Sequence, residues 1–203
     1  MKKIKKVFFI LIIIILIIFF MFFLFKIMTK NKKNGNNMNS QEIVDKILDL
    51  TSYTAKVKVQ VNSNKNTNKY VLFQKFNSQE GSMQEVIEPE NIAGVKIIKN
   101  NNNLSIENSN LDLKTIFENY NGLESNSLDL INFINEYKEN NELDFEEKGE
   151  EIILKTKARK ESKYLENKKL YIDKKSIMPK KMIIQDNNQN ETIIIEYIEI
   201  ELN

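Results

Sequence analysis

An uninterrupted apolar run near the amino terminus places the strongest constraint on this chain. Nineteen consecutive residues from Val7 to Phe25 (VFFILIIIILIIFFMFFLF) include no charged or polar side chain. As a helix rising about 1.5 Å per residue, this run is roughly 28 Å long, which matches the hydrocarbon thickness of a bilayer. Four lysines precede the run, and four more follow it before residue 34. The pattern predicts a transmembrane helix over residues 7–28.

The alternative interpretation of this run is a cleaved signal peptide. Such a peptide has a shorter apolar core, followed by small residues at the cleavage site. Here the segment after the run is Lys26-Ile27-Met28-Thr29-Lys30, and the chain has no cysteine that could carry a lipid. We therefore expect an uncleaved signal-anchor in the cell membrane. Lysines flank both ends of the helix almost equally, and the short basic tail of residues 1–6 favours a cytoplasmic amino terminus with an extracytoplasmic carboxyl-terminal domain.

The part of the chain beyond the apolar run divides into a linker and one domain. Residues 29–39 are polar and lack periodicity, so they predict a flexible linker. Residues 40–203 are numerous enough for one domain with a hydrophobic core. From residue 34 onward the chain has 22 basic and 28 acidic side chains. This acidic balance argues against binding of nucleic acid and against a domain lying flat on anionic lipid.

The residue types that the chain lacks exclude several kinds of chemistry. It contains no histidine and no cysteine, which excludes Ser-His and Cys-His nucleophiles, thiolate chemistry and an ordinary zinc site. The acidic stretch 136–151 lacks the spacing of a calcium loop and is interpreted as a solvated loop. We predict a protein that is not an enzyme and has no cofactor, and we assign no catalytic, cofactor-binding or metal-binding residue. Hydrolysis by two carboxylates is the enzymatic alternative, although no pattern indicates a pair.

Hydrophobic periodicity predicts a domain that is rich in strands. Ser40 is placed to cap a short amphipathic helix with Ile43 and Ile47 on one face. Residues 54–61 alternate between apolar and polar side chains, which predicts a half-buried strand. Turn residues, including a turn over residues 89–94, separate further strands. These strands are expected over residues 69–76, 82–88, 95–99, 104–107, 151–158, 168–173, 180–186 and 191–202, with a short one at 143–145.

Two more helices are expected in the middle of the domain. The first is predicted from four residues at helical spacing, Leu113, Ile116, Phe117 and Tyr120. The second covers residues 127–139, with Leu128, Ile131 and Ile134 facing inward and Phe133 and Tyr137 as further candidates for that face. The order is then one helix, five strands, two helices, and four or five strands. Hairpin connections imply an antiparallel sheet with the helices on its one apolar face, which is an α+β fold.

Several short segments resemble the LolA-like superfamily. These segments are residues 50–55 at the start of the first strand, the PENIAG turn at 89–94, and the LYID and MPKK segments at 170–173 and 178–181. The resemblance covers residues 40–203. It implies an unclosed antiparallel β-barrel, or half-barrel, with helices packed in its concave face. Within the superfamily the chain is most similar to the GerS-like germination lipoproteins of spore-forming clostridia, although it lacks their lipidated cysteine.

Two different kinds of function are implied by this resemblance. GerS-like proteins act with CwlD, an amidase of the spore cortex. The first expectation is therefore a membrane-anchored protein of the spore envelope that binds and supports such an amidase. Carriers and sensors of the superfamily hold acyl chains, so the second expectation is a tethered receptor for lipid or lipoprotein. A fixed anchor forbids long-range carriage, which favours the first. Exposed strand edges would also allow docking by strand addition or a homodimer.

Two further features have both a structural and a binding interpretation. The alternating isoleucines and glutamates of residues 196–202 are typical of an amphipathic strand, with a partner-binding edge as the alternative. Most aromatic residues are expected in the core, with the lining of a ligand cavity as the alternative. The aromatic residues considered are Tyr53, Tyr70, Phe73, Phe76, Phe117, Tyr120, Phe133, Tyr137, Tyr164, Tyr171 and Tyr197.

Overall fold

The computed structural model describes residues 38–100, 103–108, 110–120, 128–140, 145–162 and 165–203, with the backbone alone for 159–162. The predicted transmembrane helix over residues 7–28 and the basic tail of residues 1–6 lie outside these ranges. Within the ranges, no helix has the length and apolarity needed to cross a bilayer. Residues 39–203 form one compact unit.

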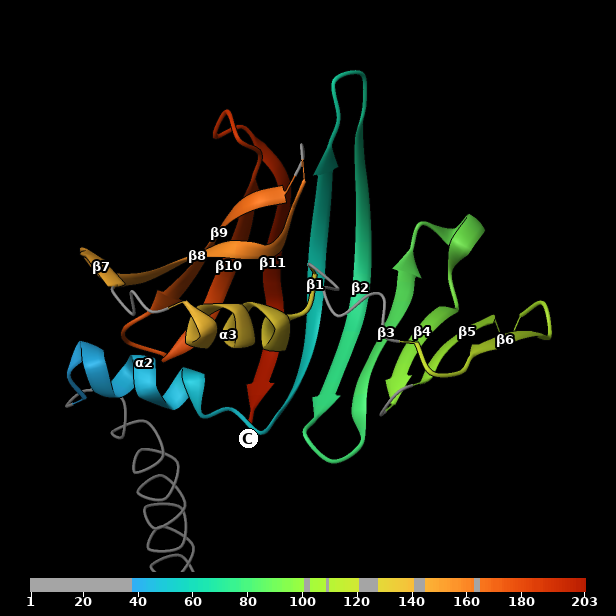
Figure 1. Cartoon of the computed structure of the whole chain (residues 1–203), viewed down its shortest axis with the longest axis horizontal. Helices are drawn as coiled ribbons and strands as arrows, with labels where there is room; N and C mark the ends of the chain where they lie inside the picture. The colour runs from blue at the N-terminus through green and yellow to red at the C-terminus, as the bar shows by residue number, and fades with distance from the viewer. Residues whose placement is uncertain (1–37, 101–102, 109, 121–127, 141–144, 163–164) are drawn as a thin grey trace, which may run out of the picture. The chain divides into compact units, whose positions relative to one another are not determined.

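A single sheet of eleven strands forms the body of this unit, and every neighbouring pair of strands is antiparallel (Figure 1). The strand order is β6-β5-β4-β3-β2-β1-β11-β10-β9-β8-β7. The end strands β6 and β7 do not pair with each other, so the sheet is open. The strands are β1 (Ser52–Asn62), β2 (Thr67–Asn77), β3 (Gly81–Glu88), β4 (Val95–Asn100), β5 (Asn103–Asn108), β6 (Leu113–Phe117), β7 (Phe145–Lys148), β8 (Glu151–Ser162), β9 (Leu165–Asp173), β10 (Met178–Gln185) and β11 (Glu191–Leu202).

The first and last strands of the domain lie side by side at the centre of the sheet. β1 pairs with β2 on one side and with β11 on the other. The alternation predicted for β1 is confirmed, because Ala55, Val57 and Val59 are buried while Lys56 and Lys58 are exposed. β11 has neighbours on both sides, β1 and β10. Within the isoleucine and glutamate run at 196–202, only Glu196 also pairs with β10, so residues 197–202 pair with β1 alone among the described strands and keep one unpaired edge.

The first described helix, α2 (Ser40–Leu48), is capped by Asn39, whereas the sequence predicted a cap at Ser40. The side-chain oxygen of Asn39 accepts the backbone N–H of Glu42 at 2.9 Å, and the Glu42 carboxylate accepts the Asn39 N–H at 2.8 Å. This reciprocal capping box satisfies two N–H groups at the start of the helix. Ser40 is thus the first helical residue. The buried face of α2 consists of Ile43, Val44 and Ile47.

The second described helix, α3 (Leu130–Glu139), packs against β8 and also contacts α2. Figure 1 shows α2 and α3 on the same side of the sheet. Of the expected inward residues, Phe133, Ile134 and Tyr137 are buried, whereas Leu128 and Ile131 are only half-buried and Leu130 is buried in addition. The helix begins after Asp129 and not at residue 127.

The helix predicted from Leu113, Ile116, Phe117 and Tyr120 is wrong. Residues Leu113–Phe117 form strand β6, which pairs with β5 from Asn108 opposite Leu113 to Leu104 opposite Phe117. A spacing of four residues keeps two side chains on the same face of a helix and also of a strand, so Leu113 and Phe117 fit both periods. Pairing with β5 decides between them. The order is therefore one helix, six strands, one helix and five strands among the described elements.

Candidate binding groove

A groove of about 760 Å³ lies between α3 and the strands β3, β4 and β5. Pockets that hold small molecules have volumes of roughly 300–1,000 Å³ and are mostly apolar with a few polar groups. This groove has a volume in that range, and its polar side chains include Gln84, Lys99 and Asp129. Its apolar lining includes Phe76, Ile97, Leu104, Ile106, Ile131 and Ile134.

The sheet side of the groove continues as an apolar strip to the open edge of the sheet. Ile97 of β4 lies opposite Ile106 of β5, and Leu104 of β5 lies opposite Phe117 of β6. Cross-strand partners, and residues two apart along a strand, share one face, so Leu113 belongs to the same face. We call these five residues the apolar strip. Three of them are well exposed: Ile97 by 39%, Ile106 by 40% and Leu113 by 61%. A contiguous exposed apolar surface is typical of a site that binds a ligand or partner.

The opposite face of the same strands is charged. Glu85, Lys96, Glu107 and Lys114 are consecutive cross-strand partners on β3, β4, β5 and β6. The Lys96 ammonium is 3.5 Å from the Glu85 carboxylate, and the Lys114 ammonium is 2.7 Å from the Glu107 carboxylate. A hydrogen bond from Lys114 holds the pKa of Glu107 below its usual range. This face thus combines ion pairs with the apolar side chains of Met83, Ile98 and Ile116, whereas the face with the strip carries none of these ion pairs.

The amino-terminal end of α3 is held by two glutamines that lie directly opposite each other. Gln74 of β2 and Gln84 of β3 are cross-strand partners. The Gln74 side-chain N–H donates to the backbone carbonyl of Leu128 at 3.0 Å, and the Gln84 side-chain N–H donates to the Asp129 carboxylate. Both glutamines are buried, at 0% and 6% exposure, so these bonds are sheltered from water. They fix the start of α3 beside the groove.

Asp129 is a buried carboxyl group at the beginning of α3. It occupies the N-cap position, but its side chain makes no capping bond and turns to Gln84 instead. Burial raises the pKa of Asp129 to about 7, although the hydrogen bond from Gln84 and the charge of Lys99 act in the opposite direction. Burial also raises the pKa values of Tyr53 and Tyr197, and the negative charge of Asp129 adds to both effects. Asp129 therefore exchanges its proton near neutral pH.

A buried ion pair holds the other end of α3. The Lys168 ammonium of β9 is 2.6 Å from the Glu136 carboxylate, and their side chains are 1% and 4% exposed. Glu136 follows Asp129 by seven residues, which is about 10.5 Å along a helix. β3 and β9 are five positions apart in the sheet order, or about 24 Å in a flat sheet. Because one short helix contacts both strands, the sheet bends around it.

The residues singled out in the sequence have different positions in the structure. Tyr53, Phe133 and Tyr137 are buried in the core, as expected, whereas Phe117 is 41% exposed, and Tyr164 lies outside the described residues. Glu136, which was assigned to a solvated acidic stretch, is instead buried against Lys168. Sequence reasoning missed Asp129 and Lys168. The available signal for Lys168 was its place two residues before Leu170, in phase with the buried side of β9.

The open antiparallel sheet with its two described helices is the LolA-like fold that the sequence resemblance implied. The chain belongs to the sporulation protein YdcC-like family, whose family model matches residues 5–203. The resemblance inferred from the sequence is thereby confirmed. No curated protein matches the chain significantly.

Solved structures with the same fold include GerS. The GerS lipoprotein, in the structure of the CwlD amidase from Clostridioides difficile in complex with it, is 23% identical, with a TM-score of 0.54 over 83% of this chain and 98% of that chain. An uncharacterized conserved protein from Thermus thermophilus is 13% identical, with a TM-score of 0.50 over 82% of this chain and 88% of its own. A LolA superfamily protein from Nitrosomonas europaea is also 13% identical, with a TM-score of 0.42 over 82% of this chain and 94% of its own.

Proposed function

We propose that this protein is a membrane-anchored, non-enzymatic component of spore formation or germination that binds and supports a peptidoglycan amidase of the cortex. One combination carries the proposal: the chain belongs to a sporulation family, and it shares its fold with GerS, whose solved structure is a complex with the CwlD amidase. In this role the amidase supplies the catalytic residues and this protein supplies a binding surface.

The composition of the chain supports a role without catalysis of its own. It has neither histidine nor cysteine, so it has no Ser-His or Cys-His nucleophile and no ordinary zinc site. In the described part of the chain, no group of three or more acidic side chains is placed to hold a metal ion. The apolar run of residues 7–25 supports attachment to the membrane through a helix over residues 7–28, with the domain exported to the side on which the wall is built.

The apolar strip at the open edge of the sheet is the surface that we assign to the amidase. Leu113 and Phe117 lie on β6, which pairs on one side only. Exposed apolar side chains beside unpaired backbone N–H and C=O groups are suited to docking by strand addition. The charged side chains of Glu85, Lys96, Glu107 and Lys114, which lie on the other face of β3 to β6, would remain in water. The partner is therefore expected to contact the groove side of this edge.

The test combines binding with activity. The full chain in a non-ionic detergent is mixed with a CwlD-like amidase and separated by size-exclusion chromatography. Peptidoglycan cleavage is then measured for the amidase alone, for this protein alone and for both. We expect co-elution at near-equal amounts, higher activity of the mixture, and no cleavage by this protein alone. Absence of a complex would reject the amidase role, and cleavage by this protein alone would reject the non-enzymatic one.

The groove favours a second candidate function, a tethered receptor for an acyl chain of a lipid or lipoprotein. Its volume and its apolar lining by Ile97, Ile106 and Ile134 suit a hydrocarbon chain. Mass spectrometry of lipids that co-purify with the full chain separates the two functions. A stoichiometric lipid without any amidase binding would favour the receptor, and an amidase complex free of lipid would favour the first proposal.

A further inference from the structure

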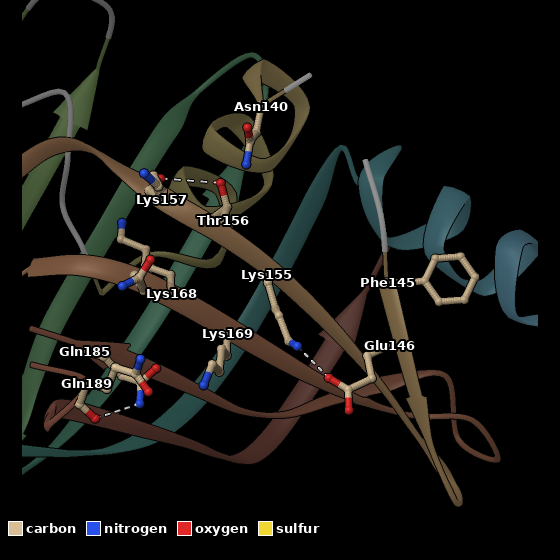
Figure 2. Close-up of a pocket in the computed structure, with 11 residues that line it drawn as sticks. Asn140, Phe145, Glu146, Lys155, Thr156, Lys157, Lys168, Lys169, Gln185 and Gln189 are labelled. Carbon is tan, nitrogen blue, oxygen red and sulfur yellow. Dashed lines mark hydrogen bonds and ion pairs between the residues drawn. The ribbon is translucent and has the colours of Figure 1, made fainter. Parts of the chain in front are cut away.

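A second cleft, of about 670 Å³, lies between the end of α3 and the strands β7 to β10 (Figure 2). Its chemistry differs from that of the groove, because its lining includes four lysines, Lys155, Lys157, Lys168 and Lys169. The lining also includes the amide side chains of Asn140, Asn167 and Gln185. The cleft is thus a basic and polar site on a domain whose overall balance is acidic.

Two of the four lysines are already neutralised by carboxylates. Lys168 is paired with Glu136 at 2.6 Å. Lys155 forms an ion pair with Glu146 of β7, which Figure 2 shows as a dashed line. The pKa of Glu146 is lowered mainly by its hydrogen bond from Lys155, with a smaller contribution from the charge of Lys169. Neither Lys157 nor Lys169 has an ion-pair partner of its own among the described residues.

The strand register places three of the four lysines, Lys155, Lys157 and Lys169, on one face, and Lys168 on the other. Lys155 lies directly opposite Lys169, and Lys157 lies directly opposite Asn167. Lys157 and Lys169 are diagonal neighbours on the same face. The backbones of such neighbours are roughly 7–8 Å apart, so two long side chains can reach one shared ligand. Like charges directly opposite each other destabilise a sheet. Lys155 and Lys169 both act on the Glu146 carboxylate, whereas Lys157 has no carboxylate paired with it among the described residues, so an additional anion between Lys157 and Lys169 would relieve the repulsion on this face.

The uncharged part of the lining indicates what carries that anion. The Asn167 carboxamide can donate and accept hydrogen bonds, as sugar hydroxyl groups require, whereas the Gln185 side-chain N–H already donates to the Gln189 carbonyl at 2.9 Å and its oxygen remains as an acceptor. Lysine ammonium groups bind phosphate as well as carboxylate, so the charges alone do not identify the anion. The volume of about 670 Å³ also exceeds what a single inorganic anion fills. We propose that this cleft binds an acidic saccharide, with its carboxylate between Lys157 and Lys169 and its hydroxyl groups on Asn167 and Gln185.

The proposal is tested by direct binding to the full chain in a non-ionic detergent at low salt. The probe is a fluorescent tetrasaccharide of alternating N-acetylglucosamine and N-acetylmuramic acid, and its matched neutral control is a tetramer of N-acetylglucosamine. Anisotropy titrations are repeated with inorganic phosphate and with a hexaglutamate peptide as competitors. We expect the acidic saccharide to bind at least about tenfold more tightly than the neutral one. A difference of this size corresponds to the gain from one charge-assisted hydrogen bond. Binding should weaken as salt screens the lysines.

Variants locate the site. Lys157→Gln and Lys169→Gln should each weaken binding about tenfold. Lys175→Gln removes an exposed lysine from the turn between β9 and β10 and should leave binding unchanged. Equal binding of the acidic and neutral saccharides would overturn the proposal, as would full binding by both cleft variants. Competition by phosphate or hexaglutamate at concentrations similar to those of the saccharide would reject the saccharide in favour of a general anion or an acidic protein segment. None of these outcomes depends on whether an amidase binds elsewhere.

Discussion

The ammonium group of Lys168 lies 2.6 Å from the carboxylate of Glu136, and both side chains are almost completely buried. Lys168 belongs to β9, and Glu136 belongs to α3. Together with the contact between Gln84 and Asp129, this pair attaches one helix to two distant strands of the sheet. The position of α3 beside the groove therefore depends on buried polar contacts as well as on apolar packing.

Removal of one partner from this ion pair should strongly destabilise the domain. Lys168→Met or Glu136→Leu leaves the other charge buried without its counter-ion, which costs about 3–5 kcal/mol. The double variant removes both charges and should be less destabilised than the sum of the single changes. Urea unfolding of the full chain in a non-ionic detergent measures the free energy of unfolding of each variant. A loss below about 1 kcal/mol in both single variants would contradict a dominant structural role for the pair.

The stability of the domain should fall as the pH rises toward neutrality. The pKa of Asp129 is raised from its ordinary 3.8 to about 7 in the folded state, so the folded chain binds more protons than the unfolded chain between these values. The stabilising contribution of the neutral carboxyl is complete below about pH 4 and is lost as the pH passes 7, by at most about 1.4 kcal/mol per pH unit.

Urea unfolding at intervals from pH 5.5 to 8 measures this dependence. Carboxyl groups with lowered pKa values, such as Glu107, have the opposite sign but titrate below this range. The chain contains no histidine, the side chain that ordinarily titrates here. Asp129→Asn should therefore flatten the profile. An unchanged slope in that variant would show that another group is responsible.

Gly81 should not tolerate a side chain, because of both its backbone conformation and its neighbour. Its φ is +98°, and a Cβ at this position would lie 2.0 Å from the backbone oxygen of Lys99. Gly81→Ala should cost about 2 kcal/mol or more in the free energy of unfolding. Gly149→Ala is the matched control, since its φ is +60° but no atom lies within 4 Å of the added Cβ. Equal losses in the two variants would indicate that the contact with Lys99 is unimportant.

A charge placed in the groove should reduce its affinity for apolar molecules. Ile106→Asp introduces a carboxylate on the groove face of β5, where desolvation of the charge opposes apolar binding. We expect roughly tenfold weaker binding of an apolar fluorescent dye. Ile116→Asp is the control, because Ile116 is 54% exposed and lies on the other face of neighbouring β6. An equal effect of both variants would argue against binding in the groove.

The amidase complex should be weakened by charges on the apolar strip. Leu113 and Phe117 are 61% and 41% exposed, so aspartate at both positions should leave the fold intact. The double variant should lower the affinity for a CwlD-like amidase about tenfold or more, as expected for central interface residues. Ile198→Asp changes a similarly exposed isoleucine on β11 and should have little effect. Calorimetric titration distinguishes the variants, and unchanged affinity of the double variant would place the interface elsewhere.

Local patterns were enough to predict most strands and an antiparallel sheet, whereas its open form was implied by the resemblance to the LolA-like superfamily. The alternation around Val57 and Val59 depends only on which residues lie two apart, and each hairpin turn is coded by neighbouring residues. The element at 113–117 was predicted incorrectly because Leu113 and Phe117 satisfy the helical and the strand period equally well. Its pairing with Leu104 and Asn108 of β5 is a contact between separate segments.

The apolar run, the acidic domain, the lack of histidine and cysteine, and the strand periodicity are properties of the sequence alone. The contact between Gln84 and Asp129 and the ion pair between Lys168 and Glu136 are not. Each joins residues from segments that only the folded sheet and helix bring together. The same is true of the lysine cleft, where Lys155 and Lys169 become neighbours through the register of β8 and β9. Burial and cross-strand distance determine the charge and binding properties of these side chains, and both quantities exist only in the tertiary structure.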